Sequence, residues 1–220
     1  MPNHFENSET LSLEKFKEMD YLAVEQYNLP IELMMENAGL QLARLITMHA
    51  TKNSKILIGV GNGNNGGGGL VAARRLAAWG FDIYLDIPIK ITKTLPKTQL
   101  ERAILFGTKE EFIKEPDIWV DAYLGFSQRL PLSAIFLERI NAANNSAAFR
   151  ISLDIPIGIS KDLKEPMFRA DQVLTLAAPK DVLNLLPPET DIRIADLGIP
   201  FGIYEKYNIP MPSFYKNQLL

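Results

Sequence analysis

Side chains that could bind a small ligand stand beside glycines in three short stretches of this sequence. Residues 61–69 read Gly-Asn-Gly-Asn-Asn-Gly-Gly-Gly-Gly, and two aspartates, Asp121 and Asp154, each follow an apolar run and precede a turn that contains glycine. Glycines let a ligand approach backbone N–H groups closely, and a following helix adds unpaired N–H groups and a positive dipole end. This chemistry suits an anion, and a phosphate group best.

Residues 61–66 also match the dinucleotide-binding pattern G-x-G-x-x-G, so a Rossmann dehydrogenase is an alternative. Asp86 lies about 20 residues further on, where such a site has a carboxylate that binds the ribose. Two observations weigh against this alternative. The match follows two whole predicted helices, and the glycines continue through Gly69, which is longer than that tight turn needs. The paired Asn64 and Asn65 suit recognition of a hydroxyl, a carboxamide or a cation.

The composition excludes several kinds of catalysis. The chain has no cysteine, so a disulfide, a thiolate zinc site and a cysteine nucleophile are all excluded. Its two histidines, His4 and His49, lie in a predicted N-terminal tail and near the end of a helical pattern, where we expect them on the surface. Acid–base chemistry must therefore use carboxylates, lysine or tyrosine.

The length and charge are those of one ordinary globular domain. With 220 residues, 47% hydrophobic and 22% charged, the chain is expected to fold as a single domain over residues 1–220. The net charge of −3 gives no reason to expect nucleic acid as a partner. The sequence has neither a signal-peptide pattern at its start nor the roughly 18 consecutive apolar residues of a membrane span, so we expect a cytoplasmic protein without membrane attachment.

Hydrophobic periodicity predicts alternating strands and helices after two N-terminal helices. Ser12 should cap the first helix, Pro30 should start the second, and Met34 and Met35 should pack in the core. A helix should begin near Val71, after the glycine loop. The other predicted elements are strands at 56–60, 83–87, 117–122, 149–153, 173–176 and 192–195, helices at 99–106, 132–143 and 179–186, and an extended tail over 204–220.

This alternation predicts a largely parallel sheet with helices on both faces, a three-layer α/β/α Rossmann-like domain with two additional N-terminal helices. In such sheets ligands bind beyond the carboxyl ends of the strands. The glycine loop, Asp121 and Asp154 should therefore lie along one edge. The alternative for the two aspartates is a purely structural role in turns or helix caps.

Taken together, seven ordered stretches resemble the YjeF N-terminal family, the NAD(P)H-hydrate epimerases. They are spread in the right order along most of the length of the chain and comprise residues 35–39 (Met-Glu-Asn-Ala-Gly), 61–67, 69–74, 121–127, 153–158, 178–180 (Ala-Pro-Lys) and 195–200. The resemblance implies an isomerase that interconverts the R and S epimers of hydrated NADH and NADPH. A partner dehydratase can then convert the S hydrate back to the intact dinucleotide. It also implies a bound potassium ion and a homodimer.

The resemblance assigns roles to individual residues. Asn65 and Asp121 correspond to potassium ligands, and oxygen donors of this kind suit a hard cation. Lys90 corresponds to a catalytic lysine of the family, although an exposed lysine is a poor base at neutral pH. The residues implied to contact the hydrate are Asn64, Asn65, Gly66, Gly67, Gly68, Gly125, Phe126, Ser127, Gln128, Arg129, Leu130 and Asp154.

Three positions depart from the family pattern. Gly68 stands where the family loop usually has an aspartate, Ile157 replaces a serine that would bind potassium, and residues 128–131 (Gln-Arg-Leu-Pro) lack a catalytic aspartate. A positioned acid–base group is worth typically ~10²- to 10⁴-fold in rate. The sequence therefore leaves two hypotheses, an epimerase whose activity is weak or lost, with Asp154 as a substitute acid–base group, and a catalytically silent module that binds a nucleotide or a protein.

Overall fold

A computed structural model describes residues 4–162 and 166–214, and these residues form one six-stranded sheet. The strands are β1 (Lys55–Val60), β2 (Asp82–Asp86), β3 (Ile118–Ala122), β4 (Phe149–Leu153), β5 (Gln172–Leu176) and β6 (Asp191–Ala195). All neighbouring pairs are parallel, in the order β2-β1-β3-β4-β5-β6. The predicted parallel sheet is confirmed, and each predicted strand lies within a residue of its predicted ends.

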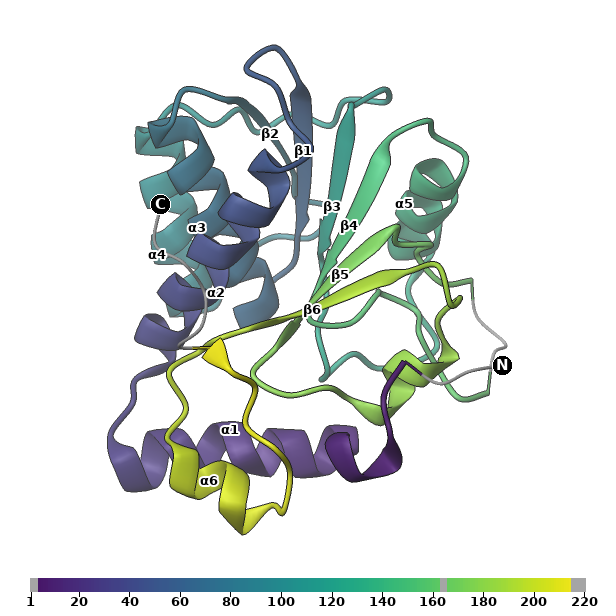
Figure 1. Ribbon diagram of the computed structural model, residues 1–220. Helices are drawn as coiled ribbons and strands as arrows, with labels where there is room; N and C mark the ends of the chain where they lie inside the picture. The colour runs from purple at the N-terminus through teal and green to yellow at the C-terminus, as the bar shows by residue number, and fades with distance from the viewer. Residues whose placement is uncertain (1–3, 163–165, 215–220) are drawn as a thin grey trace.

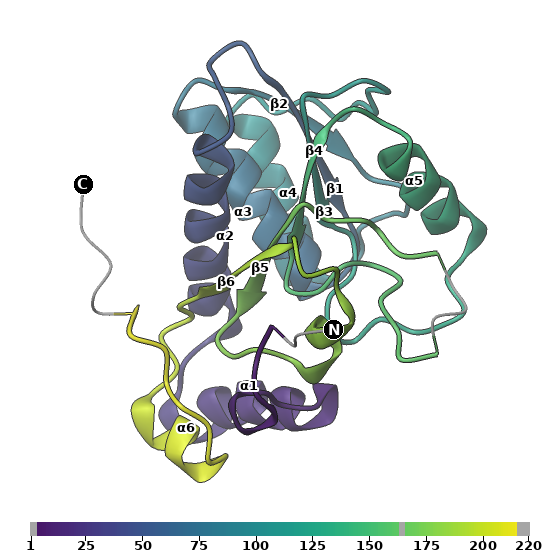
Figure 2. The same cartoon turned by 45° about the vertical axis from the view of Figure 1, so that its right-hand side comes forward.

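Helices cover both faces of this sheet, as predicted for a three-layer α/β/α fold. Helices α2 (Ile31–Thr47), α3 (Asn64–Ala78) and α4 (Thr94–Leu105) lie on one face, and α5 (Ala134–Asn144) lies on the other (Figures 1 and 2). Separate buried apolar clusters fill the two spaces between the helices and the sheet. The inner strands β1, β3, β4 and β5 are largely buried on both sides, which explains their almost continuous apolar sequences.

Two further helices lie across one end of the sheet. Helix α1 (Leu13–Tyr27) and the short α6 (Phe201–Lys206) lie side by side there (Figure 1) and share a third apolar cluster with the strand ends. Ser12 caps α1 as predicted, since its hydroxyl accepts a hydrogen bond from the N–H of Lys15 at 3.3 Å. Helix α1 therefore closes the edge of the sheet where the site is expected.

Several boundaries differ from those predicted. Helix α4 starts five residues early, because Pro96 falls in its first turn, where proline is tolerated. Helix α5 starts at Ala134, after Ser133, and the segment predicted as a helix at 179–186 is a 3₁₀ helix, η2 (Asp181–Leu185). The extended tail predicted from residue 204 was wrong at its start, since buried Tyr204 belongs to α6; residues 215–220 lie outside the described residues.

The glycine loop was predicted too long. Helix α3 begins at Asn64, so residues 66–69 form its first turns, and none of the glycines between 61 and 69 has a positive φ. Their role is close packing. A Cβ at Gly69 would lie 2.6 Å from the Cβ of Ala122 in β3, and one at Gly67 would lie 2.5 Å from the Cε of Met35 in α2. The glycines therefore let α3 approach both the sheet and α2.

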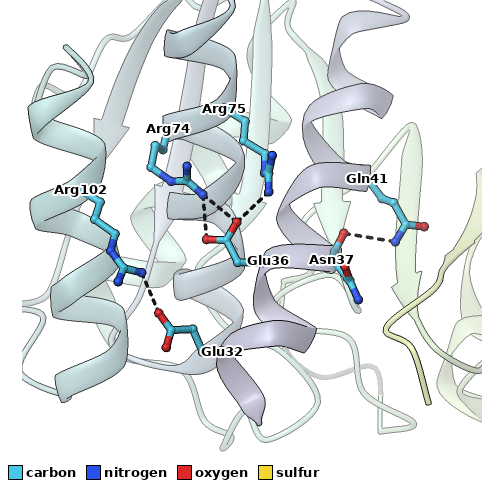
Figure 3. A network of polar contacts seen from close by, with 7 residues as sticks. All are labelled: Glu32, Glu36, Asn37, Gln41, Arg74, Arg75 and Arg102. Carbon is cyan, nitrogen blue, oxygen red and sulfur yellow. Dashed lines mark hydrogen bonds and ion pairs between the residues drawn. The ribbon is translucent and has the colours of Figure 1, made fainter. Parts of the chain in front are cut away.

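Ion pairs fix the outer side of this helical layer (Figure 3). Glu36 of α2 pairs with Arg74 and Arg75 of α3 at 2.7 and 2.8 Å, and Glu32 pairs with Arg102 of α4 at 2.7 Å. The partly buried Glu36 pairs hold α2 and α3 in one relative position.

No helix among the described residues is long and apolar enough to cross a membrane.

We predict that Gly69→Ala destabilises the fold by about 1–3 kcal/mol, because the added methyl group would overpack the contact with Ala122. Helix propensity alone would give the opposite sign, since alanine is favoured over glycine by about 1 kcal/mol in a helix interior. Equilibrium urea unfolding measures the change. Gly63→Ala is the control, because a Cβ there would meet nothing within 4 Å. Equal stability of the two variants would contradict the packing argument.

Candidate functional site

A cavity lies beyond the carboxyl ends of the strands. The chain passes from β1 outward to β2 and returns to β3 on the other side of β1, so the strand order reverses between β1 and β3. Ligands of open parallel sheets bind at such a switch point. Here a cavity of about 540 Å³ lies between the start of α3, the segments after β3 and β4, and the inner faces of α1 and α2.

Asn65 occupies the centre of this arrangement. Its Nδ2 donates hydrogen bonds to the carbonyl oxygens of Leu124 at 3.0 Å and Leu153 at 3.3 Å, which follow or end the neighbouring strands β3 and β4. Its Oδ1 is buried and has no hydrogen-bond partner among the described residues. A buried amide oxygen without a hydrogen-bond partner indicates that a ligand, an ion or a water molecule binds there.

Asp154 follows β4 and forms a buried ion pair. Its Oδ1 lies 2.8 Å from Nζ of Lys180, and the two side chains are 1% and 0% exposed. Its Oδ2 accepts a hydrogen bond from the N–H of Phe126 at 2.8 Å. Asp154 also has a φ of +73°, a left-handed conformation that is uncommon outside glycine and tends to persist at functional sites.

Three neighbouring residues hold the buried side chain of Lys180 in place. Its Nζ donates hydrogen bonds to Oγ1 of Thr175 and the carbonyl oxygen of Leu176, and it lies 3.6 Å from the ring centroid of Phe16 in α1. Burial lowers the pKa of Lys180, and the Asp154 carboxylate opposes this effect. Because a buried charge without a counterion is costly, the two side chains depend on each other.

Asp121 is fully buried at the end of β3, just outside the cavity lining. Burial raises the pKa of Asp121 to about 7, while hydrogen bonds from the N–H of Ile157, the hydroxyl of Ser152 and the N–H of Tyr123 oppose the rise. No cationic side chain among the described residues pairs with it. It is therefore a buried carboxylate whose charge is not balanced by the protein.

The structure brings most of the predicted contact residues to the cavity. Its lining includes Asn64, Asn65, Gly68, Gly125, Phe126, Ser127, Arg129 and Asp154. Gly66 and Gly67 do not line it, because they pack against Gly61 and Met35. Gln128 and Leu130 line a second cavity of about 230 Å³, and Gln128 is bound to the backbone of Gly158 and Pro156.

A different lysine from the predicted one reaches the cavity. Lys90 is exposed and is not part of the lining, whereas Lys93 is. Asn62 explains this placement, since its Oδ1 accepts hydrogen bonds from the N–H groups of Thr92 and Lys93 at 2.7 and 2.9 Å. This side chain ties the loop after β2 to the start of α3, so Lys93 is the lysine of this loop that lines the cavity.

Asp86 cannot serve as the ribose carboxylate of a dehydrogenase. It is 3% exposed, and its Oδ2 accepts hydrogen bonds from the hydroxyl of Tyr123 at 2.6 Å and from Nε of Arg139 at 2.8 Å. Its function is structural. The two histidines also lie away from the cavity lining, and His49 is exposed, as expected.

Sequence reasoning missed several residues of the site. Met34 and Met35 are buried, as predicted, but they also line the cavity. Asp20 of α1 lines it too, one helical turn after Phe16. A carboxylate at this spacing on the apolar side of an amphipathic helix was the available signal. For Lys180 the signal was its place in the Ala-Pro-Lys motif, to which no role had been assigned.

We predict that Lys180→Met lowers the free energy of unfolding by about 3–5 kcal/mol, because Asp154 would stay buried without its counterion. Adding Asp154→Asn should recover part of the loss, since asparagine is neutral and tolerates a positive φ. Urea unfolding of both variants measures this coupling. Lys161→Met, which removes an exposed pair with Asp181, is the control and should cost at most about 1 kcal/mol. Independent, additive effects of the Lys180 and Asp154 changes would refute the coupling.

Comparison with known proteins agrees with this geometry. The sequence model of the family described as YjeF-related protein N-terminus matches residues 31–182. An NAD(P)H-hydrate epimerase of Rhodopirellula baltica is 33% identical over an alignment of 217 residues that covers 90% of this chain and 88% of that protein. An NAD(P)H-hydrate epimerase of Plasmodium knowlesi is 36% identical over an alignment of 198 residues that covers 83% of this chain and 67% of that protein.

A solved structure shows the same fold. The crystal structure of yeast ynu0 superposes with a TM-score of 0.83 and covers 95% of this chain and 97% of its own, at 23% identity. The family match includes α2, the start of α3 and the segments after β3 and β4, which line much of the cavity, whereas α1 lies outside the matched range. The chain belongs to the family of YjeF-related N-terminal domains.

Proposed function

We propose that this protein is an NAD(P)H-hydrate epimerase, an isomerase that interconverts the R and S epimers of hydrated NADH and NADPH. The observation that carries the proposal is the convergence of Asn64, Asn65, Ser127 and Asp154 on one cavity at the switch point of the sheet. Relatives named as epimerases align with 83–90% of the chain.

The charges around the cavity suit a dinucleotide. Lys17, Lys93 and Arg129 contribute cationic side chains to its wall, and the N-terminus of α3 faces it through Asn64 and Asn65. Unpaired N–H groups and the dipole of a helix N-terminus favour phosphate oxygens. The apolar part of the wall, with Met34, Met35 and Phe126, suits the ring systems.

The reaction needs little from the protein besides orientation and proton transfer. Hydration of the reduced nicotinamide ring places the hydroxyl on a carbon next to the ring nitrogen, and the nitrogen lone pair can expel it as water. The carbon becomes planar, and water can then return to the other face. A group that protonates the leaving hydroxyl accelerates this step, typically by ~10²- to 10⁴-fold.

We predict that the purified chain equilibrates R and S hydrates faster than they equilibrate spontaneously, and that Asn65→Ala lowers kcat/KM by about 10- to 100-fold. The expected loss follows from about 1–3 kcal/mol for the hydrogen bonds that hold the ends of β3 and β4 to α3. Time courses of the two epimers, resolved by chromatography, measure the rate. Asn145→Ala, an exposed change at the end of α5, should leave the rate unchanged.

A rival function is favoured by one observation. The loop after Ser127 carries no carboxylate, and Gln128 is used to hold the backbone after β4. A silent module that binds a nucleotide would therefore bind NADPH or ADP-ribose in calorimetry yet leave the epimers at their spontaneous rate. If the protein binds the nucleotide but does not accelerate epimerisation even at high protein concentration, the epimerase proposal is refuted and the silent binding module takes its place.

We further propose a potassium ion at Asn65 and Asp121. Two observations support the fit: within residues 4–162 and 166–214, the buried Oδ1 of Asn65 has no hydrogen-bond partner and no cationic side chain pairs with the buried Asp121 carboxylate. No group of three or more His, Cys, Asp or Glu side chains that could hold a metal occurs among the described residues, so any ion would need carbonyl ligands as well. When bound, potassium would supply positive charge beside Asp121.

We predict that potassium raises Tm relative to tetramethylammonium at equal ionic strength, and that Asn65→Ala abolishes the difference. A stabilisation of about 1 kcal/mol corresponds to roughly 2–4 °C in a protein of this size. Thermal unfolding followed by circular dichroism is the measurement. If the large cation, which cannot enter a small oxygen cage, stabilises the protein as much as potassium does, the ion site is refuted.

The homodimer and the cytoplasmic location implied by the family resemblance stay predictions, as does the single domain over residues 1–220.

A further inference from the structure

Asp20 is placed on the cavity by the inner face of α1. It lies one helical turn after Phe16, whose ring covers the ammonium group of Lys180 and meets the ring of Phe126 edge-on at 5.1 Å. Asp20 and Asp154 both line the same cavity. The first helix therefore presents a second carboxyl group to the space where the ligand is proposed to bind.

Asp20 differs from the other enclosed carboxylates in having no partner. Asp154 is paired with Lys180, and Asp86 is paired with Arg139 and accepts a hydrogen bond from Tyr123. Asp121 accepts three hydrogen bonds. Among the described residues Asp20 forms neither a hydrogen bond nor an ion pair, although it is partly buried. Its hydrogen-bonding capacity is left for whatever occupies the cavity.

The surroundings of Asp20 favour its neutral form. The pKa of Asp20 is raised to about 6, chiefly by burial and also by the Asp154 charge, while Lys180 opposes the rise. The remaining charged or titratable groups of the cavity wall are Lys17, Tyr21, Lys93, Tyr123 and Arg129. Asp154, by contrast, has a counterion and an N–H donor that balance its negative charge. Two carboxyl groups in different environments are a common arrangement of a proton donor beside an ionised group.

We propose that Asp20 is the catalytic proton donor of this protein, which places on α1 the acid that the loop after Ser127 lacks. The proposal rests on the proposed epimerase function. Asp20 gives its proton to the hydroxyl of the hydrate, the carbon–oxygen bond breaks, and water leaves while the ring nitrogen forms a double bond to the carbon. When water adds to the other face, a new carbon–oxygen bond forms and the excess proton returns to the Asp20 carboxylate through the water of the cavity.

The decisive variant is Asp20→Asn, which keeps the shape of the side chain and removes the proton. We expect kcat to fall by about 10²- to 10⁴-fold, while the Kd for ADP-ribose, which lacks the reacting ring, stays within about threefold. Glu25→Gln is the matched control, because it makes the same kind of change on the exposed side of α1. It should leave both quantities unchanged.

The pH profile separates proton transfer from a merely structural role. After subtraction of the spontaneous rate, kcat of the unchanged protein should fall about tenfold per pH unit above roughly pH 6–7, because the protonated fraction of an acid with a pKa of about 6 falls in that range. The residual kcat of Asp20→Asn should not show this decrease with rising pH. Asp20→Glu should restore part of the rate.

The outcomes separate this proposal from the one on which it rests. If the unchanged protein accelerates epimerisation and Asp20→Asn is as fast, only the role of Asp20 is overturned. If the unchanged protein binds ADP-ribose but accelerates nothing, both proposals are overturned. Circular dichroism and Tm show whether Asp20→Asn is folded. Should it fail to fold, Asp20→Ser replaces it, and a full rate in that variant would equally overturn the assignment.

Discussion

The close approach of helix α3 to the sheet is the constraint on which the rest of the site depends. Gly69 lets the helix axis come near β3, and Gly67 leaves room for Met35 of α2. Side chains of ordinary size would push the start of the helix outward. Asn65 could then no longer reach the carbonyl oxygens of Leu124 and Leu153, so two strand ends would lose the amide that joins them. Helix packing and ligand site are therefore one structural unit.

Because helices and strands pack closely here, charged side chains lie in the interior, where each needs a counterion. Asp154 and Lys180 form the central pair, and Phe16 covers the ammonium group from α1. Through this contact α1 is held against the ends of β4 and β5, which closes the cavity. A buried pair adds little net stability compared with apolar packing, yet each partner becomes costly without the other. Its value here is that it fixes the position of Asp154 and of the covering helix.

The departures from the family pattern acquire a physical meaning in this setting. A Cβ at Gly68 would lie 3.1 Å from Cδ2 of Leu153, so a small rearrangement of one side chain would be needed to accommodate an aspartate there. The backbone N–H of Ile157 donates a hydrogen bond to Asp121, although its side chain lacks the hydroxyl of the serine that the family has at this position. The main chain around Asp121 is thus the kind that a cation site needs, while one side-chain ligand is missing. Asp20 supplies a carboxyl group from a different element.

The sequence by itself determined the fold class, the order of the strands along the chain and the short list of candidate residues. Apolar runs that end in Asp121 and Asp154 specify buried parallel strands with polar ends, because strand periodicity and turn preferences are local properties. Matching of ordered motifs then identified the family. These inferences needed no knowledge of which side chains meet in space.

Only the tertiary structure decided the role of each candidate. The glycines between 66 and 69 proved to be packing positions within a helix, because contacts with Ala122 and Met35, both distant in sequence, set the available space. Lys93 lines the cavity and Lys90 does not, because Asn62 binds the backbone of that loop. Asp20 became a candidate acid because burial and two charges from other elements act on it. Burial and the pairing of charges are sums over residues far apart in the chain, so local sequence patterns could not reveal them.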